Sequence, residues 1–206
     1  DLTVLSEQPG RLLVAGACDA MAKKIEIEFW NSLPGGTANP VASGIASIVS
    51  DYIYGDLDRK IDAAFGDVRR GEVTQTLKDV LFSSVVGAGI VSGISGGARQ
   101  TALAHGFYFF ARERYTAQAV RYTHGELVAV GLVLQLAYYG RVQESERFAA
   151  RLRGWGLAAS MGDLGFAYGE EDAAACMDYL RSMDGMKAAG ADAVPRLEKA
   201  LKAVFR

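Results

Sequence analysis

A helix-capping pattern runs directly into a long apolar segment at Tyr122-Thr123-His124-Gly125-Glu126-Leu127-Val128-Ala129-Val130-Gly131-Leu132. Thr123 and Glu126 have the spacing of a capping box, in which each side chain pairs with the backbone N–H of the other residue. His124 is therefore expected to be the first residue of a helix that covers about residues 124–139. Because this helix is apolar nearly all round, we expect it to lie in the middle of the protein.

The position of His124 favours the neutral form of its side chain, since a positive charge would oppose the dipole at a helix start. Neutral imidazole is the form that binds metal ions, and the chain contains only 2 histidines in all. Gly125 leaves space beside the imidazole for another group to approach. The alternative is that His124 only occupies the start of the helix and binds nothing.

The composition indicates a mainly helical protein without a basic surface. Half of the 206 residues are hydrophobic and only 4 are proline, which suits a full core in one or two domains. The formal net charge is −2 and the basic residues are scattered, so we expect no nucleic-acid partner. We also expect no membrane partner, because we expect no apolar run to be long enough to span a membrane.

The two cysteines, Cys18 and Cys176, lie far apart and have no metal-binding spacing. This favours a reduced, cytoplasmic protein, although a single disulfide stays open. The chain begins at Asp1 with neither an initiator Met nor a signal-peptide pattern, so it could be a piece of something longer.

Apolar residues at helical spacing predict helices along the whole chain and no strand, and therefore an all-α, multi-helix bundle. The expected helices cover about 11–29, from Asn39-Pro40 to about 65, from Gly71-Glu72 onward with Val73 inward, 101–112, 124–139, 143–155, 171–183 and 193–205. Breaks are expected at Pro34-Gly35-Gly36 and at Gly96-Gly97.

Residues 82–97 contain the glycine spacing GxGxxxG, formed by Gly87, Gly89 and Gly93. This spacing resembles a dinucleotide-binding loop, in which glycines let the backbone approach a pyrophosphate. No separate strand leads into it, however, and no later strand accompanies it. We therefore favour a buried helix whose glycines and serines allow close packing.

Three polar residues, Asp19, His105 and His124, stand inside or at the edge of otherwise apolar helices. A carboxylate with two neutral imidazoles suits Zn²⁺ or Fe²⁺ and leaves positions open for water or substrate. Their separation in sequence means that the fold must bring them together. For Asp19 the alternative is a salt bridge to Lys23, one helical turn further on. A histidine paired with a serine or cysteine nucleophile also stays open, although nothing in the local sequence favours it.

Residues 11–23 (RLLVAGACDAMAK), 102–108 (ALAHGFY) and 122–131 (YTHGELVAVG) together resemble the metal-binding helical domain of glycerol dehydrogenases. These enzymes belong to the iron-containing alcohol dehydrogenase and dehydroquinate synthase superfamily. The segments stand in the order of the family and roughly at its spacing, and the resemblance covers about residues 1–140 well and the rest more loosely. Tyr108 replaces a further histidine found in many relatives, and Cys18 replaces the usual glycine before the aspartate.

The resemblance implies that Asp19, His105 and His124 hold Zn²⁺, or Fe²⁺ as in the related alcohol dehydrogenases. It implies a dehydroquinate synthase-like C-terminal metal-binding domain over 1–206, and an N-terminal NAD-binding α/β domain that is absent from this chain. In the intact enzyme the metal would bind the hydroxyl of a polyol such as glycerol and lower its pKa, and the resulting alkoxide would pass a hydride to NAD. Glu126 would support His124 by capping its helix.

The 206-residue chain alone is accordingly expected to give no dehydrogenase turnover. The expected partners are a small alcohol or polyol and further copies of the chain in a homo-oligomer. Two other functions stay open. One is a lyase of the dehydroquinate synthase type, although that enzyme is expected to carry a glutamate where this chain has Asp19. The other is a helical interaction domain that has lost its metal.

Overall fold

The computed structural model describes residues 2–36, 39–96 and 100–205, and all regular structure in these ranges is helical. In chain order the elements are α1 (Leu2–Ser6), α2 (Gly10–Asn31), α3 (Pro40–Arg70), α4 (Gln75–Phe82), the π-helical turn η1 (Ser83–Gly87), α5 (Ala88–Ser95), α6 (Leu103–Arg114), α7 (Thr116–Ala119), α8 (His124–Tyr138), α9 (Val142–Gly154), α10 (Glu170–Ser182), α11 (Asp184–Ala189) and α12 (Ala193–Leu201). The expected all-α fold is confirmed.

Helix α8 lies at the centre of the molecule, as its apolar sequence predicts. Every residue of α8 except His124 and Ala137 is buried. The helix packs against α2, α6, α9 and α12, which surround it. Burial of each large apolar side chain contributes about 1.5–3 kcal/mol, so α8 is the element around which the others assemble.

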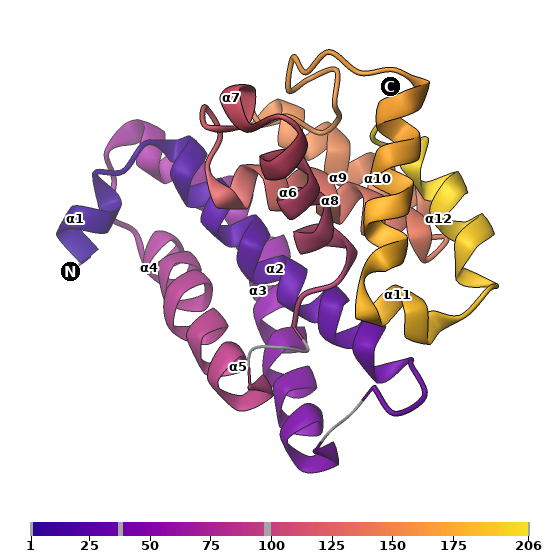
Figure 1. Cartoon of the computed structure of the whole chain (residues 1–206). Coiled ribbons are helices and arrows are strands. Elements are labelled where there is room, and N and C mark those ends of the chain that lie inside the picture. The colour runs from indigo at the N-terminus through magenta and orange to yellow at the C-terminus, as the bar shows by residue number, and fades with distance from the viewer. Residues whose placement is uncertain (1, 37–38, 97–99, 206) are drawn as a thin grey trace.

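The other helices form two groups beside this centre (Figure 1). Helices α4 and α5 lie along α2 and α3 on one side, and α10, α11 and α12 lie on the opposite side. Helix α3 begins as expected after Asn39, whose side-chain oxygen accepts hydrogen bonds from the backbone N–H groups of Val41 and Ala42, each at 3.1 Å. It continues without a break through Gly55 to Arg70.

The expected helix start at Gly71-Glu72 is wrong. Gly71 instead ends α3 in the left-handed region, with φ of 68°, where glycine carries no steric penalty. The next helix begins at Gln75, because the Thr74 hydroxyl accepts a hydrogen bond from the Leu77 N–H at 3.1 Å. Val73 therefore lies in the connection with 50% of its surface exposed, rather than facing inward.

Residues 82–95 are helical, as favoured over a nucleotide loop, but they are not a buried helix. Four large apolar side chains on α4, η1 and α5 are exposed: Phe82, Val85, Val86 and Ile90. Only one face packs inward, and there Gly87 lies so close to Ile53 that a Cβ would be 2.8 Å from its side chain. Gly96 ends α5 with φ of 70°, and Gly97, its expected partner in the break, lies outside the described residues.

Helices α4 and α5 join through η1 into one continuous apolar segment, Gln75–Ser95, that is long and apolar enough to cross a membrane. The expectation that no run reaches this length is therefore wrong, because no break separates the two helices. Length and composition alone are weak grounds for a membrane span, since core helices of other proteins meet the same test.

Cys18 and Cys176 are both buried and unpaired, so the open possibility of a disulfide between them is not realised.

Candidate metal centre

Three helices bring Asp19, His105 and His124 together, although the residues are far apart in sequence. Asp19 lies on α2, His105 lies in the first turn of α6, and His124 is the first residue of α8. One ligand atom from each residue lies within 4.8 Å of the other two. The capping box of Thr123 and Glu126 is present and fixes where α8 begins, and so where His124 stands.

Two glycines on α8 allow the helices to approach closely enough for this convergence. A Cβ on Gly125, the neighbour of His124, would lie 2.2 Å from the carbonyl oxygen of Ala15 on α2. A Cβ on Gly131 would lie 2.2 Å from the carbonyl oxygen of Ala104, the neighbour of His105. Real atoms do not approach so closely, so both helix crossings require glycine. The sequence correctly indicated that Gly125 makes room for another group.

The two distances from Asp19 to the histidine nitrogens suit a single metal ion. Asp19 Oδ1 lies 3.3 Å from His105 Nε2 and 3.2 Å from His124 Nε2. Ligand atoms that bind one Zn²⁺ at about 2.0–2.2 Å in tetrahedral geometry are themselves separated by about 3.3–3.5 Å. Two imidazoles and a carboxylate are also a donor set that both Zn²⁺ and Fe²⁺ accept. The residues therefore fit the metal that the resemblance implies.

The Asp19 side chain is a carboxylate that stays charged. Burial disfavours the charged form, but hydrogen bonds from His105 and His124 outweigh this effect and hold the pKa of Asp19 well below its usual range. Among the described residues its ion pairs are with these two histidines, and Lys23 forms none with it. The alternative of an Asp19–Lys23 salt bridge is therefore not realised.

His105 is almost fully buried and is held at both ring nitrogens. Its Nε2 faces Asp19, and its Nδ1 lies 2.6 Å from Oε2 of Glu26, a carboxylate on α2. Burial alone would lower the pKa of His105, but the two negative charges raise it to about 9. The negative charges of Asp19 and Glu26 therefore favour positive charge at His105.

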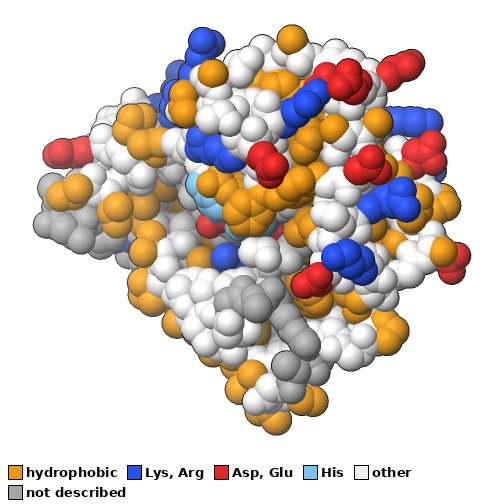
Figure 2. All heavy atoms as spheres, viewed as in Figure 1, with side chains coloured by type: hydrophobic (Ala, Val, Ile, Leu, Met, Phe, Trp, Pro, Cys, Tyr) orange, Lys and Arg blue, Asp and Glu red, His pale blue; other side chains and the backbone are white. Residues whose placement is uncertain are grey.

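His124, in contrast, is open to solvent. Its side chain is 44% exposed, and Figure 2 shows histidine atoms reaching the surface on this face of the molecule. The Tyr108 ring packs edge-on against the His124 imidazole, with 4.3 Å between ring centroids. Tyr108 comes from α6, one turn after His105, so a single helix supplies one ligand and supports the other. The open side of the centre is therefore the side of His124.

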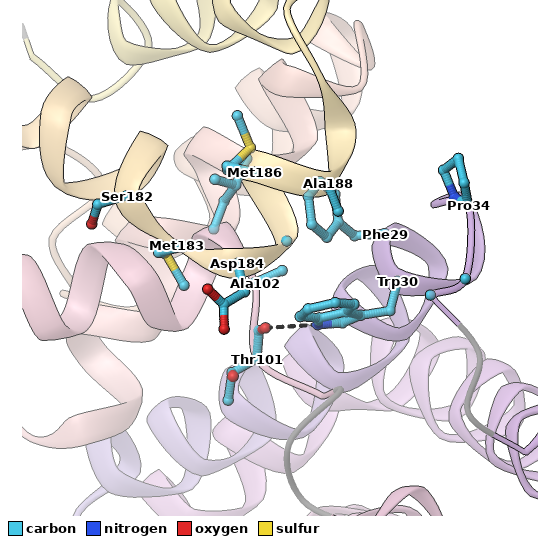
Figure 3. A pocket seen from close by; sticks show the side chains of 14 residues that line it. Phe29, Trp30, Pro34, Thr101, Ala102, Ser182, Met183, Asp184, Met186 and Ala188 are labelled. Carbon is cyan, nitrogen blue, oxygen red and sulfur yellow. Dashed lines mark hydrogen bonds between the residues drawn. The ribbon is translucent and has the colours of Figure 1, made fainter.

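A cavity lined by described residues lies away from the three candidate ligands. It measures about 640 Å³ and is bounded by Phe29, Trp30 and Met186, with the Asp184 carboxylate at its edge (Figure 3). The indole N–H of Trp30 donates to the Thr101 carbonyl oxygen at 2.9 Å across one wall. None of the three candidate ligands lines this cavity. The candidate centre is half-open, since His105 is buried and His124 is exposed.

Sequence reasoning missed Glu26, although it contacts a candidate ligand directly. Glu26 lies seven residues after Asp19 on α2, and two helical turns place the two carboxylates on the same side of the helix. A charged residue on the apolar side of a helix was the available signal, because such a residue needs a buried partner.

Comparison of the sequence with known proteins gives relatives that are named as oxidoreductases, and no family model matches the chain. A glycerol-1-phosphate dehydrogenase [NAD(P)+] of Pyrobaculum aerophilum is 28% identical over 144 residues, which are 68% of this chain and 40% of that protein. An uncharacterized oxidoreductase of Synechocystis is 29% identical over 136 residues, which are 66% of this chain and 33% of that protein. The matched region thus spans less than half the length of either relative.

Solved structures share the fold. A probable glycerol dehydrogenase from Sinorhizobium meliloti superposes with a TM-score of 0.78 at 22% identity, over 96% of this chain and 56% of that one. Glycerol dehydrogenase from Schizosaccharomyces pombe gives a TM-score of 0.73 at 18% identity, over 98% of this chain and 53% of that one. The resemblance to glycerol dehydrogenases is therefore confirmed for the fold, over about half of each solved chain.

Proposed function

We propose that this chain is the metal-binding helical part of an NAD-linked dehydrogenase that oxidises a small polyol such as glycerol. The observation that carries the proposal is the convergence of Asp19, His105 and His124, from three separate helices, within 4.8 Å of one another. The fold is shared with glycerol dehydrogenases, and one sequence relative is named as a dehydrogenase of glycerol 1-phosphate. Zn²⁺ is the metal proposed, with Fe²⁺ as the alternative.

In this proposal each residue has its own role at the centre. Asp19 supplies the negative charge, and its depressed pKa keeps that charge at neutral pH. His105 supplies a buried nitrogen, and the exposed His124 supplies the nitrogen nearest to solvent. A bound divalent cation would supply Lewis acidity that favours ionisation of a substrate hydroxyl. Glu126 and Arg11, which are 3.0 Å apart, hold the start of α8 and so the position of His124.

An assay of the complete gene product tests the proposed reaction. We expect NAD reduction with glycerol or a related polyol, and loss of that activity after the metal is removed with a chelator. Glycerol 1-phosphate belongs in the same panel, because the relative from Pyrobaculum aerophilum is named for it. Turnover of phosphorylated sugar acids without NAD reduction would instead favour the lyase alternative.

The 206-residue chain assayed alone provides the complementary test. Its described residues contain no strand, and a nucleotide-binding α/β domain needs a parallel sheet. We therefore expect the isolated chain to bind metal but to give no NADH when it is mixed with NAD and glycerol. NADH formation by the isolated chain would refute this part of the proposal. A folded chain that takes up no Zn²⁺ or Fe²⁺ would favour the metal-free interaction domain.

A further inference from the structure

Helix α6 delivers His105 to the metal centre, but it has no cap of its own. The residue before its first turn is Ala102, which has no side-chain oxygen to accept a hydrogen bond. A helix start leaves its first N–H groups without partners inside the helix, and burying them unpaired is costly. The start of α6 is buried, so these N–H groups need acceptors from elsewhere.

Two other helices supply the missing acceptors. Glu26 on α2 is fully buried, and its Oε1 accepts from the backbone N–H of Ala102 at 2.7 Å and of His105 at 2.9 Å. Gln135 on α8 accepts from the Ala104 N–H at 2.9 Å, while its own amide donates to the Ile25 carbonyl oxygen at 3.1 Å. The N-terminus of α6 is thus capped by side chains from α2 and α8.

The first oxygen of Glu26 accepts from the backbone N–H of His105, and the second oxygen contacts the imidazole ring of the same residue. Oε2 lies 2.6 Å from His105 Nδ1. A carboxylate only accepts hydrogen bonds, and a carboxylate faces each ring nitrogen: Glu26 lies 2.6 Å from Nδ1 and Asp19 lies 3.3 Å from Nε2. The shorter contact favours the proton on Nδ1 in the neutral imidazole. The lone pair is then on Nε2, the nitrogen that faces Asp19. One carboxylate therefore fixes both the backbone position of His105 and the tautomer of its ring.

We propose that Glu26 is a positioning residue of the metal centre, which holds His105 in the tautomer that binds the cation. The inference rests on the proposed metal site. It adds that the Glu26 side chain that caps α6 also orients the ring of the candidate ligand His105. Partners of this kind, behind a metal-bound histidine, typically change metal affinity about 10–100-fold when they are altered.

The variant Glu26→Gln separates the two roles of Glu26, which are to orient the His105 ring and to cap α6. The glutamine oxygen can still accept from the two backbone N–H groups, but its NH₂ group would face Nδ1 and can only donate. Nδ1 would then have to accept, and the ring proton would move to Nε2, where it blocks coordination. We expect Glu26→Gln to weaken Zn²⁺ binding about 10–100-fold, measured by competition with a chromophoric chelator.

Gln135→Ala is the matched control. It removes one backbone acceptor at the same helix start, but it does not touch the imidazole. We expect Gln135→Ala to lower the melting temperature of the metal-free chain, while Zn²⁺ affinity stays within about threefold. If Glu26→Gln binds Zn²⁺ like the unaltered chain, or if the two variants lose equal affinity at equal loss of stability, the proposal is overturned.

A measurement on the unaltered chain decides the matter if Glu26→Gln does not fold. The ¹⁵N chemical shifts of the His105 ring, recorded without metal at a pH where the ring is neutral, report which nitrogen carries the proton. We expect the proton on Nδ1, and finding it on Nε2 would overturn the proposal. This measurement needs no bound metal. A chain that takes up no metal would therefore contradict the proposed function, whereas a proton on Nε2 would contradict the Glu26 inference.

Discussion

The two histidines of the candidate centre are held by different means. The buried His105 has a carboxylate behind its ring, whereas the exposed His124 is supported by the ring of Tyr108. An exposed side chain loses more rotamer freedom when it binds a cation, so a neighbour that restricts it beforehand strengthens binding. Tyr108 contributes packing against His124 and no ligand nitrogen.

Tyr108→Ala should therefore weaken metal binding without removing a ligand. An aromatic pair of this kind contributes about 0.5–1.5 kcal/mol, which corresponds to a roughly 2- to 10-fold loss of Zn²⁺ affinity. Tyr108→Phe keeps the ring and should bind like the unaltered chain. Equal losses in both variants, measured by isothermal titration, would mean that the hydroxyl rather than the ring supports His124.

Asp163 gives a pH-dependent contribution to stability at a site remote from the candidate centre. Its Oδ2 accepts from the Arg153 guanidinium at 2.8 Å and from the Ala159 N–H at 3.0 Å. Although partial burial raises the pKa of Asp163, these hydrogen bonds hold it below its ordinary value. Because the folded pKa is depressed, this stabilisation is present above about pH 4 and is lost as the pH falls through the folded value.

Asp163→Asn should lower the free energy of unfolding at pH 7 by about 0.5–1 kcal/mol, since the pair is partly exposed to solvent. The difference between the variant and the unaltered chain should shrink as the pH is lowered from 5 toward 2. Urea unfolding at a series of pH values measures both. A difference that stays constant over that range would contradict the assignment.

At the scale of elements, the capping box at the start of α8 could be predicted from sequence because its residues are neighbours. Glu126 Oε2 accepts from the Thr123 N–H at 2.7 Å and from its hydroxyl at 2.9 Å. The start of α6 could not be predicted in the same way, since its acceptors come from α2 and α8. The exposed face of residues 82–96 was missed because an apolar sequence does not reveal which of its faces is covered.

Thr123→Ala tests the capping box. Loss of a threonine cap costs about 0.5–2 kcal/mol of stability, and Thr123→Ser should restore most of it because the hydroxyl is kept. Chemical denaturation of both variants gives the comparison. A Thr123→Ala variant as stable as the unaltered chain would mean that the bond between Glu126 and Arg11 holds the helix start by itself.

The crossing of α6 and α8 gives a sharper test. Gly131→Ala would place a Cβ 2.2 Å from the Ala104 carbonyl oxygen, and backbone atoms cannot yield without moving the helices apart. We expect a loss of about 3 kcal/mol or more, together with weaker metal binding, because His105 would move away from His124. Gly89→Ala in α5 is the control. A Cβ there meets nothing within 4 Å, so this change should stabilise the helix by about 0.5–1 kcal/mol.

At the scale of the whole molecule, the hydropathy pattern of the sequence was sufficient to predict the all-α fold and the central position of α8. Convergence of three side chains from distant helices depends on tertiary packing, and periodicity alone cannot reveal it. Their polarity within apolar helices indicates the three residues as candidates, and the short motifs around each of them resemble a known domain. Glu26 was not found, since the motif ended at Lys23 and a single buried carboxylate carries no motif of its own.

A Zn²⁺ titration of the unaltered chain, His105→Ala and His124→Ala tests most directly whether the three residues form a metal site. The chain has only 2 histidines, so neither variant contains a substitute ligand of this kind. We expect one Zn²⁺ per unaltered chain and no uptake by either variant, with helical circular dichroism preserved in all three. Absence of binding by the folded unaltered chain, or undiminished binding by either variant, would contradict a metal centre formed by Asp19, His105 and His124.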